Sequence, residues 1–470
     1  MRYEKELDTV LQTIIARWGI PGMGVGIAQD GKIIYTRSFG VQSLETGAAV
    51  TPDSIFCVAS IAKCFVATAV MQLAERGKID LNAPLVQYLP YFRLDDERCR
   101  QITPRQILSH TSGMPDFDES EYDELVANPE YDDRAAERLV RSLVHRKLAA
   151  APGEHFHYSN IAYNVLGDLI TKVSGQSFET YMRENILLPA GMPDSTFWPA
   201  DVPPHRLAVP HLRTPQMRVN PVYPYHRADA PASFLHSTVV DMCHWGITCL
   251  NRGIYNGERI LSEDGYTHMW TPVAKWGYPP LYEDMGLGWT LGHFDGLQTI
   301  SHGGMGFGWS AFFLLVPERN CAAIILGNEE SSARSRLIRA VLHTMLDQEP
   351  QPNTVSWMVP ICQALGAGGF QAAYDRYTEI KDSPDYFFDA DELPNLVIQL
   401  TSVKQFVLAI DALRLNLQVF PEHIESHLSL ARLYLQKGEN AQAEAILSQA
   451  LSIQPDNAAA AELLEIIRPI

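Results

Sequence analysis

Long apolar runs and basic residues are the scarcest features of this 470-residue sequence. No stretch of about 18 consecutive apolar residues occurs, so we predict that nothing spans a membrane. Lys and Arg number 37 against 55 Asp and Glu, which gives a formal net charge of −18. A chain this acidic is a poor match for nucleic acid or for anionic lipid, and we expect neither as a partner.

The N-terminus lacks the features of a secretory signal. The stretch "MRYEKELDTVLQTIIARW" has no continuous apolar segment and no small-residue cleavage site. Its apolar residues instead recur with a helical period. We therefore expect an amphipathic helix here and a cytoplasmic protein; the alternative is a periplasmic protein whose signal has been removed.

Cysteine is sparse and follows no pattern. The cysteines are residues 57, 64, 99, 243, 249, 321 and 362. They form no CxxC pair and their number is odd, which favours free, buried thiols in a reducing compartment. His155-Phe156-His157 resembles a metal motif, but alternating side chains point to opposite faces and no third ligand is near in sequence. We predict no metal and no cofactor.

The length exceeds what one ordinary core supports, so we expect two domains. A polar, proline-bearing stretch indicates the boundary. The prediction is a first domain over residues 1–348, a linker over 349–353 and an α-helical domain over 354–470.

Strand-like segments lie near both ends of the first domain. Two apolar-rich runs flank Asp30-Gly31, a pair typical of a tight hairpin turn, and short glycine-bounded strands follow residue 286. Apolar helices are predicted at 60–76 and 161–174, and another helix at 332–347. The pattern predicts an α/β (α+β) fold with one sheet built from both ends of the domain and helices between.

A 34-residue period runs through the last part of the chain. With Pro421 and Pro455 as equivalent points, Ala409 matches Ala443 and Leu413 matches Leu447. This alternation of small and large residues resembles the tetratricopeptide repeat (TPR), in which paired helices stack. We expect this region to bind a protein partner or to mediate self-association.

The residues with the clearest chemical meaning begin at Ser60-Ile61-Ala62-Lys63. On a helix, Ser60 and Lys63 share a face, and a desolvated lysine loses its proton readily enough to activate a serine hydroxyl. Taken alone, this short motif is weak evidence, because a lysine at a helix start also reaches the surface with its head group. Both interpretations stay open at this point.

Two further motifs shift the balance towards catalysis. The first, Tyr158-Ser159-Asn160, precedes an apolar helix. A tyrosine can shuttle protons if a nearby cation such as Lys63 lowers its pKa. An asparagine amide can bind a substrate amide. The alternative is a core tyrosine followed by a helix cap.

The third motif, His302-Gly303-Gly304, lies on a predicted strand. Its glycines would let a substrate approach the strand edge. The backbone N–H groups of Met305 and Ser60 are then candidates for an oxyanion hole.

The order and spacing of these three motifs resemble the family of class C serine β-lactamases and D-Ala-D-Ala carboxypeptidases (S12 peptidases, CubicO-type proteins and their esterase relatives). Supporting stretches include "TPRQILSHTSGMP", "PGEHFHYSNIAYNVLGDLI" and "YEDMGLGW", and the resemblance runs from about residue 8 to 347. It implies an antiparallel sheet flanked by helices with an all-α subdomain, and an acyl-enzyme mechanism without metal.

The resemblance also implies roles for individual residues. Ser60 would be the nucleophile, Lys63 and Tyr158 would share the base and acid roles, and Asn160 would bind the acyl-side amide of the substrate. The strand from His302 to Met305 would hold the substrate. Class C β-lactamases usually carry Lys-Thr-Gly at the third motif, and a neutral histidine holds a carboxylate less firmly than lysine does.

We therefore expect a serine hydrolase that acts on small esters, amides or peptides, like an esterase or D-amino-acid peptidase. Two alternatives are open: a β-lactamase or carboxypeptidase proper, and an inactive hydrolase-like scaffold that binds proteins through its TPR-like region. Which of Lys63 and Tyr158 is the first base is also open, because coupled groups need not have separable roles.

Overall fold

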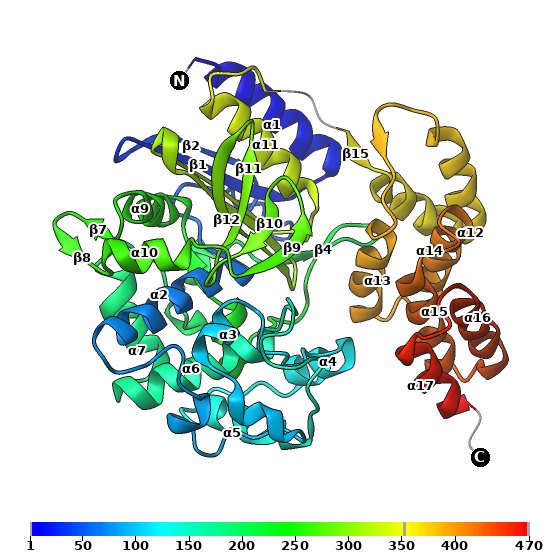
Figure 1. Cartoon of the computed structure of the whole chain (residues 1–470). Helices are drawn as coiled ribbons and strands as arrows, with labels where there is room; N and C mark the ends of the chain where they lie inside the picture. Colours follow the sequence, from blue (N-terminus) through cyan, green and yellow to red (C-terminus); the bar gives the residue numbers. More distant parts are fainter. Residues whose placement is uncertain (1, 351–353, 468–470) are drawn as a thin grey trace. The chain divides into compact units, whose positions relative to one another are not determined.

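The computed structural model describes residues 2–350 and 354–467 (Figure 1). Contacts divide the described chain into two compact units. The first comprises residues 1–15, 19–211 and 219–351, and the second comprises 16–18, 212–218 and 352–470. Part of the predicted linker, 351–353, lies outside the described residues.

An eight-stranded antiparallel sheet forms the centre of the first unit, with strand order β2-β1-β14-β13-β12-β11-β10-β9. The strands are β1 (Gly22–Gln29), β2 (Lys32–Gly40), β9 (Ala274–Tyr278), β10 (Tyr282–Met285), β11 (Thr290–Phe294), β12 (Leu297–Gly306), β13 (Trp309–Val316) and β14 (Cys321–Gly327). The pairing of β1 with β14 confirms the predicted sheet built from both ends. The hairpin around Asp30-Gly31 is also confirmed, since β1 pairs with β2.

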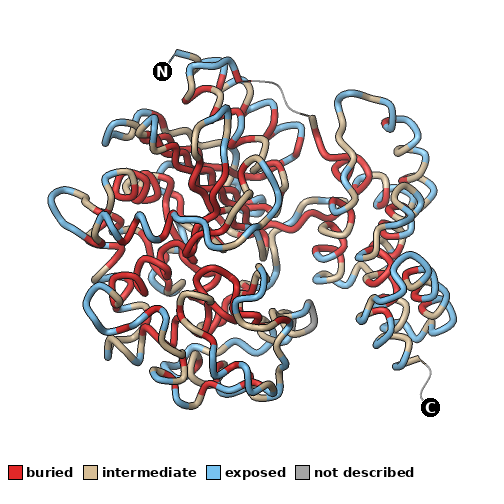
Figure 2. Tube along the Cα trace, in the orientation of Figure 1, coloured by how far each residue is buried: buried red, intermediate tan, exposed pale blue. Residues whose placement is uncertain are grey.

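Helices cover both faces of this sheet (Figure 1). The helices of the first unit are α1 (Glu4–Trp18, of which residues 16–18 count with the second unit), α2 (Ala62–Glu75), α3 (Pro104–Leu108), α4 (Glu119–Ala127), α5 (Ala135–Ser142), α6 (Asn160–Ser174), α7 (Phe178–Met182), α8 (Ala230–Ser233), α9 (Val239–Leu250), α10 (Glu263–Met269) and α11 (Ala333–Met345). The helices predicted at 60–76, 161–174 and 332–347 correspond to α2, α6 and α11. Figure 2 shows buried chain concentrated in the central strands and α2, as the apolar sequence of α2 requires.

Short two-residue strands complete the structure. They are β3 (Phe56–Cys57), β4 (His211–Leu212), β5 (Arg218–Val219), β6 (His236–Ser237), β7 (Ile254–Tyr255), β8 (Glu258–Arg259), β15 (Val355–Ser356) and β16 (Tyr386–Phe387). The pairing of β3 with β6 matters for the site, because β3 leads directly into the turn that carries Ser60.

The C-terminal part of the second unit is helical. Its helices are α12 (Met358–Ile380), α13 (Glu392–Ser402), α14 (Phe406–Val419), α15 (Ile424–Gln436), α16 (Asn440–Ile453) and α17 (Ala458–Ile467). Ala409, Leu413, Ala443 and Leu447, the residues matched by the 34-residue period, are all buried. Small and large residues therefore alternate where the helices pack, as expected for this kind of repeat.

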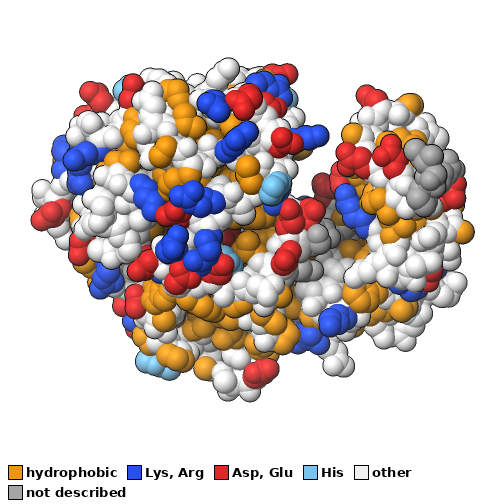
Figure 3. Space-filling model, turned by 90° about the horizontal axis from the view of Figure 1, so that it is seen from below, with side chains coloured by type: hydrophobic (Ala, Val, Ile, Leu, Met, Phe, Trp, Pro, Cys, Tyr) orange, Lys and Arg blue, Asp and Glu red, His pale blue; other side chains and the backbone are white. Residues whose placement is uncertain are grey.

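None of the described helices is long and apolar enough to cross a membrane. On the face drawn in Figure 3, Lys and Arg side chains lie beside Asp and Glu side chains rather than in a separate basic patch. Arg98 pairs with Asp96, for example, and Arg141 with Glu137. All seven cysteines are free and buried, as predicted.

Candidate active site

Ser60 lies on a tight turn between β3 and α2. The turn is a 3-10 helix over Ala59–Ile61, and Ala59 has a positive φ of 47°, a conformation that costs a residue with a side chain about 1 kcal/mol or more. Ala59 and Ile61 are buried, whereas Ser60 is partly exposed. The turn therefore presents the serine hydroxyl outward from an apolar base.

Lys63 is fully buried, and its amine contacts Ser60 directly. Its Nζ donates to Ser60 Oγ (2.9 Å), Asn160 Oδ1 (2.7 Å) and the carbonyl oxygen of Ala232 (2.8 Å). Burial lowers the pKa of the Lys63 amine, and the negative charges of Asp229 and Asp116 oppose that shift without cancelling it. The shared face predicted for Ser60 and Lys63 is confirmed.

Tyr158 lies beside both Ser60 and Lys63. Its ring stacks on His110 with centroids 4.2 Å apart, and Lys63 Nζ lies over the ring, 4.9 Å from its centroid. Burial raises the pKa of the Tyr158 hydroxyl above its ordinary value, and a hydrogen bond with Ser60 opposes that shift only in part. The expectation that Lys63 would lower this pKa is wrong, because the amine faces the ring and the surroundings are desolvated. Tyr158 is therefore a neutral hydroxyl at physiological pH.

Asn160 begins α6, where Ser159 caps the helix by accepting from the N–H of Ala162. The Asn160 amide is engaged at both ends: Oδ1 accepts from Lys63, and Nδ2 donates to Asp116 Oδ2 (2.9 Å). The Tyr122 hydroxyl is also hydrogen-bonded to this side chain. A substrate amide would have to compete with these contacts.

The strand β12 brings His302, Gly303, Gly304 and Met305 alongside the Ser60 turn. β11 pairs with β12 only as far as Ser301, so the segment after Ser301 borders the turn instead. A Cβ on Gly304 would lie 2.1 Å from the carbonyl oxygen of Val58, so any larger residue would push the strand away from the turn. Glycine here is therefore a requirement of the close approach.

His302 is buried and neutral. Burial, with a second contribution from Lys63, lowers the pKa of its imidazole to about 3. Its Nδ1 lies 2.7 Å from the carbonyl oxygen of Gly303 and donates to it, and Nε2 has no partner among the described residues. The third motif therefore offers a hydrogen-bond acceptor where a lysine would offer a cation.

Aromatic rings surround the Tyr158 side of the cluster. Trp276 lies 4.8 Å from Phe156 and 5.2 Å from Tyr282 between ring centroids, and Tyr122 packs on Phe307 at 5.8 Å. Among the described residues, no group of His, Cys, Asp and Glu is arranged to hold a metal ion. The imidazole of His110 instead accepts from the N–H of Ser159 and braces the loop that carries Tyr158.

Sequence reasoning missed several residues of this cluster. Asp116 directly follows the quoted stretch "TPRQILSHTSGMP", and it accepts from the N–H groups of Asn160 and Ile161 as well as from the Asn160 amide. A carboxylate just beyond that turn was a readable signal. Asp229 and Ala232 come from "RADAPAS", which carries no motif that indicates a role.

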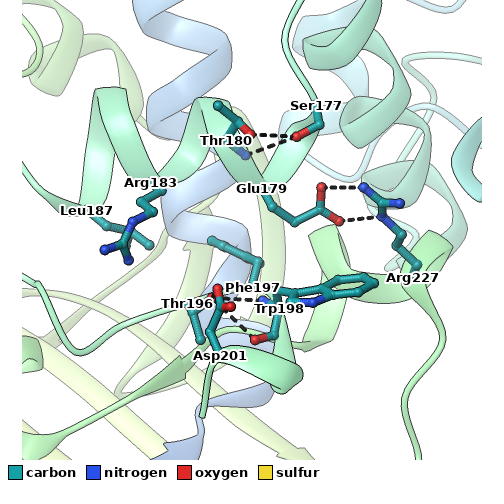
Figure 4. Close-up of a pocket in the computed structure, with 10 residues that line it drawn as sticks. All are labelled: Ser177, Glu179, Thr180, Arg183, Leu187, Thr196, Phe197, Trp198, Asp201 and Arg227. Carbon is teal, nitrogen blue, oxygen red and sulfur yellow. Dashed lines mark hydrogen bonds and ion pairs between the residues drawn. The ribbon is translucent and has the colours of Figure 1, made fainter. Parts of the chain in front are cut away.

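A separate cavity of about 240 Å³ lies in the same unit (Figure 4). It is lined by Ser177, Glu179, Thr180, Arg183, Leu187, Thr196, Phe197, Trp198, Asp201 and Arg227. It shares no residue with the Ser60 cluster. Figure 4 shows the two nitrogens of Arg227 that face the Glu179 carboxylate, at 2.7 and 2.9 Å, so the strongest charges here neutralise each other.

The chain belongs to the β-lactamase family, whose model matches residues 7–345. A tetratricopeptide-repeat model matches residues 400–467. The family makes this chain a serine hydrolase or acyltransferase that works through an acyl-enzyme.

Similar proteins include Protein flp of Staphylococcus aureus (strain MW2), 25% identical over 75% of this chain and 68% of the relative. Penicillin-binding protein 4 of Amycolatopsis lactamdurans is 28% identical over 66% of this chain and 81% of the relative. Among solved structures, the octameric penicillin-binding protein homologue from Pyrococcus abyssi has a TM-score of 0.65 and 26% identity, covering 74% of this chain and 78% of that one.

The penicillin-binding protein from Bacillus halodurans has a TM-score of 0.60 and 23% identity, covering 71% of this chain and 98% of that one. This match shows a similar fold. These neighbours confirm the predicted fold class, an antiparallel sheet flanked by helices with a C-terminal helical repeat region.

Proposed function

We propose that this chain hydrolyses small, uncharged esters or amides, as esterases and D-amino-acid peptidases do, with Ser60 as its nucleophile. The observation that carries the proposal is the buried Lys63 amine 2.9 Å from the Ser60 hydroxyl. Desolvation lowers the pKa of this amine, so the neutral form that takes up a proton is accessible near neutral pH.

In the proposed first step, neutral Lys63 takes the Ser60 proton while Ser60 Oγ bonds to the substrate carbonyl carbon. The N–H groups of Ser60 and Met305 would receive the developing oxyanion. The raised pKa of Tyr158 makes it an acid rather than a first base: it would give its proton to the leaving group as the carbonyl–leaving-group bond breaks. Protonated Lys63 then returns a proton to Tyr158, and water releases the acyl group.

The neutral imidazole of His302 supports a preference for uncharged substrates. A carboxylate beside a buried acceptor such as His302 Nε2 gains no ion pair and loses its hydration. An uncharged ester or amide avoids this penalty, because it brings no charge to be desolvated. This supports an esterase, or a D-amino-acid peptidase that acts on amides without a free carboxylate, over a class C β-lactamase, whose substrates carry a carboxylate.

A fluorophosphonate probe tests the proposal. We expect covalent labelling of the full-length protein and turnover of uncharged p-nitrophenyl esters or D-amino-acid amides, both abolished in Ser60→Ala. The substitution removes one oxygen atom from a partly exposed position, so its thermal melt should match that of the wild type. Absence of both labelling and turnover in folded wild type would refute the hydrolase and favour a non-catalytic scaffold.

The second unit supports an additional binding role. A tetratricopeptide match indicates protein interaction, and we propose that the helices from residue 400 onward bind a protein partner or a second copy of this chain. Sedimentation of the full-length protein over a range of concentrations tests self-association. We also propose a reducing compartment such as the cytoplasm, which the free, buried state of all seven cysteines supports.

A further inference from the structure

Two asparagines of α6 connect Lys63 to two carboxylates. Asn160 and Asn164 are four residues apart and therefore lie on one face of the helix. Asn160 links Lys63 to Asp116, as described above. Asn164 Nδ2 donates to Asp229 Oδ1 (2.6 Å), and its Oδ1 accepts from the N–H of Ala232 (3.2 Å), the residue whose carbonyl oxygen accepts from Lys63.

The hydrogen-bond chemistry of Lys63 Nζ limits how its proton and lone pair can be arranged. An ammonium has three N–H donors, and three acceptors surround it: Ser60 Oγ, Asn160 Oδ1 and the Ala232 carbonyl oxygen. The neutral amine has two N–H donors and one lone pair. A carbonyl oxygen and an amide oxygen can only accept, so they must take the two N–H donors. The lone pair then faces Ser60 Oγ, the one neighbour that also carries a donor.

The direction of the Lys63 lone pair depends on which end of the Asn160 amide faces Lys63. The contacts of Asp116 fix the orientation of that amide. Its carboxylate can only accept, and it already receives the backbone N–H groups of Asn160 (2.9 Å) and Ile161 (3.3 Å) on Oδ1. Its Oδ2, 2.9 Å from the Asn160 amide, must face the NH₂ end, which directs the oxygen end to Lys63.

We propose that Asp116 is a positioning residue that fixes the amide of Asn160, so that the lone pair of neutral Lys63 is directed at the Ser60 hydroxyl. The inference rests on the proposed roles of Ser60 and Lys63. Asp116 makes no hydrogen bond to either residue. Its charge favours protonated Lys63 through space, whereas it fixes the direction of the lone pair through Asn160. It sets the direction of proton transfer, from Ser60 to Lys63, before the substrate arrives.

Asp116→Asn gives the sharpest test, because it changes one group and keeps the shape. The oxygen of the introduced amide still accepts from the backbone N–H groups of Asn160 and Ile161, so the start of α6 is kept. Its NH₂ then faces Asn160, which must turn its oxygen towards position 116 and its NH₂ towards Lys63. The Lys63 lone pair is now satisfied by Asn160, and an N–H points at Ser60 instead.

We expect Asp116→Asn to lower kcat on p-nitrophenyl esters and the rate of fluorophosphonate labelling by about 10- to 100-fold. KM should change little, because no substrate contact is removed. The double variant Asp116→Asn/Asn160→Asp should recover most of the loss only at alkaline pH. Its carboxylate at position 160 accepts from both Lys63 and the introduced amide, which restores the direction of the lone pair, but the added charge beside Lys63 raises the pKa of the amine. Recovery by a second change is an outcome that general damage to the fold does not produce.

Asp241→Asn is a matched control. Asp241 is also a buried carboxylate that accepts from a backbone N–H and a side chain, those of Asp194 and Ser195, but it has no contact with the Lys63 cluster. Its labelling rate should equal that of the wild type. Circular-dichroism melts of every variant separate loss of fold from loss of rate.

The outcomes distinguish this proposal from the proposed function. The positioning role alone is overturned if wild type is labelled at Ser60 and Asp116→Asn is equally fast. It is also overturned if the folded double variant is as slow as the single variant at every pH. Wild type that is not labelled overturns the proposed function itself. Asn160→Ala extends the test if Asp116→Asn is poorly folded: it removes the oriented acceptor and should be at least as slow as expected for Asp116→Asn.

Discussion

Two cations of the first unit, Lys63 and Arg227, show how surroundings decide what a charge does. Arg227 lines the cavity of Figure 4, where two of its nitrogens donate to Glu179 and the third donates to Asp133. The hydrogen bond with Glu179 raises the pKa of Arg227. Lys63 is fully buried, and its contacts are a hydroxyl, an amide oxygen and a carbonyl oxygen; burial lowers its pKa.

The difference follows from the partners. Carboxylates in direct contact make the cation permanent, whereas neutral acceptors in a desolvated setting let it lose its proton. A permanent cation stabilises structure, and a cation that can become a base supports chemistry. Replacement by methionine should therefore remove activity but keep the fold at position 63, and should lower stability but keep activity at position 227.

Lys63→Met is the prediction with the largest expected effect. Methionine fills a similar volume but cannot accept a proton, so we expect fluorophosphonate labelling and ester turnover to fall by about 10²- to 10⁴-fold, the range of general base catalysis. Stopped-flow labelling measures the rate, and a thermal melt verifies the fold. Labelling near the wild-type rate in folded Lys63→Met would leave Tyr158 as the base and remove the contrast with Arg227.

The third motif provides a second way to sharpen the comparison, by adding a cation. His302→Lys would place an ammonium where the buried neutral imidazole now lies. We expect acylation by benzylpenicillin or a chromogenic cephalosporin to rise about tenfold or more relative to an uncharged ester, since hydrogen bonds to charged groups contribute about 1.5–3 kcal/mol.

His302→Gln is the matched neutral control for that variant, and its preference should stay with uncharged esters. An unchanged ratio of cephalosporin to ester reactivity in His302→Lys would show that this position does not set the charge preference of the site.

The pH dependence of acylation offers a smaller, directional test. The rate should rise as pH increases through the lowered pKa of Lys63, because only the neutral amine accepts the Ser60 proton. Ionised Asp229 favours protonated Lys63; burial raises the pKa of the Asp229 carboxyl, so this charge is present only on the upper part of the limb. Asp229→Asn removes that charge, so the rising limb of the pH–rate profile should move to lower pH while the plateau stays within a few-fold. A limb that moves to higher pH, or does not move, contradicts this assignment.

The sheet was predictable because its signals are local. Asp30-Gly31 specifies its hairpin through residues that accept positive φ, and both have it, at 50° and 74°. The strands β9 and β10 were not predicted, since their sequences "AKWGY" and "YEDM" are short, polar and partly exposed. β9 is the edge strand and β10 lies next to it, and short strands of this kind receive their structure from neighbouring strands rather than from their own pattern.

The candidate site likewise contains residues that the sequence identifies and residues that only the fold brings to the cluster. Ser60, Lys63, Tyr158 and Asn160 stand in recognisable spacings and lie together in the structure. Asp116 and Asp229 reach the cluster only through the fold. The raised pKa of Tyr158 could not be predicted either, because it depends on how much water the surrounding residues exclude, and the sequence does not give that.

Arg227→Met completes the comparison, with the smallest expected effect on chemistry. Labelling at Ser60 should equal that of the wild type. The stability should fall by about 1–3 kcal/mol in urea unfolding, because Glu179, with a side chain only 15% exposed, loses its bidentate partner. Adding Glu179→Gln should recover part of that loss, since the uncompensated charge is then gone. Reduced labelling in folded Arg227→Met would mean that the cavity of Figure 4 communicates with Ser60, and the division between a structural and a chemical cation would fail.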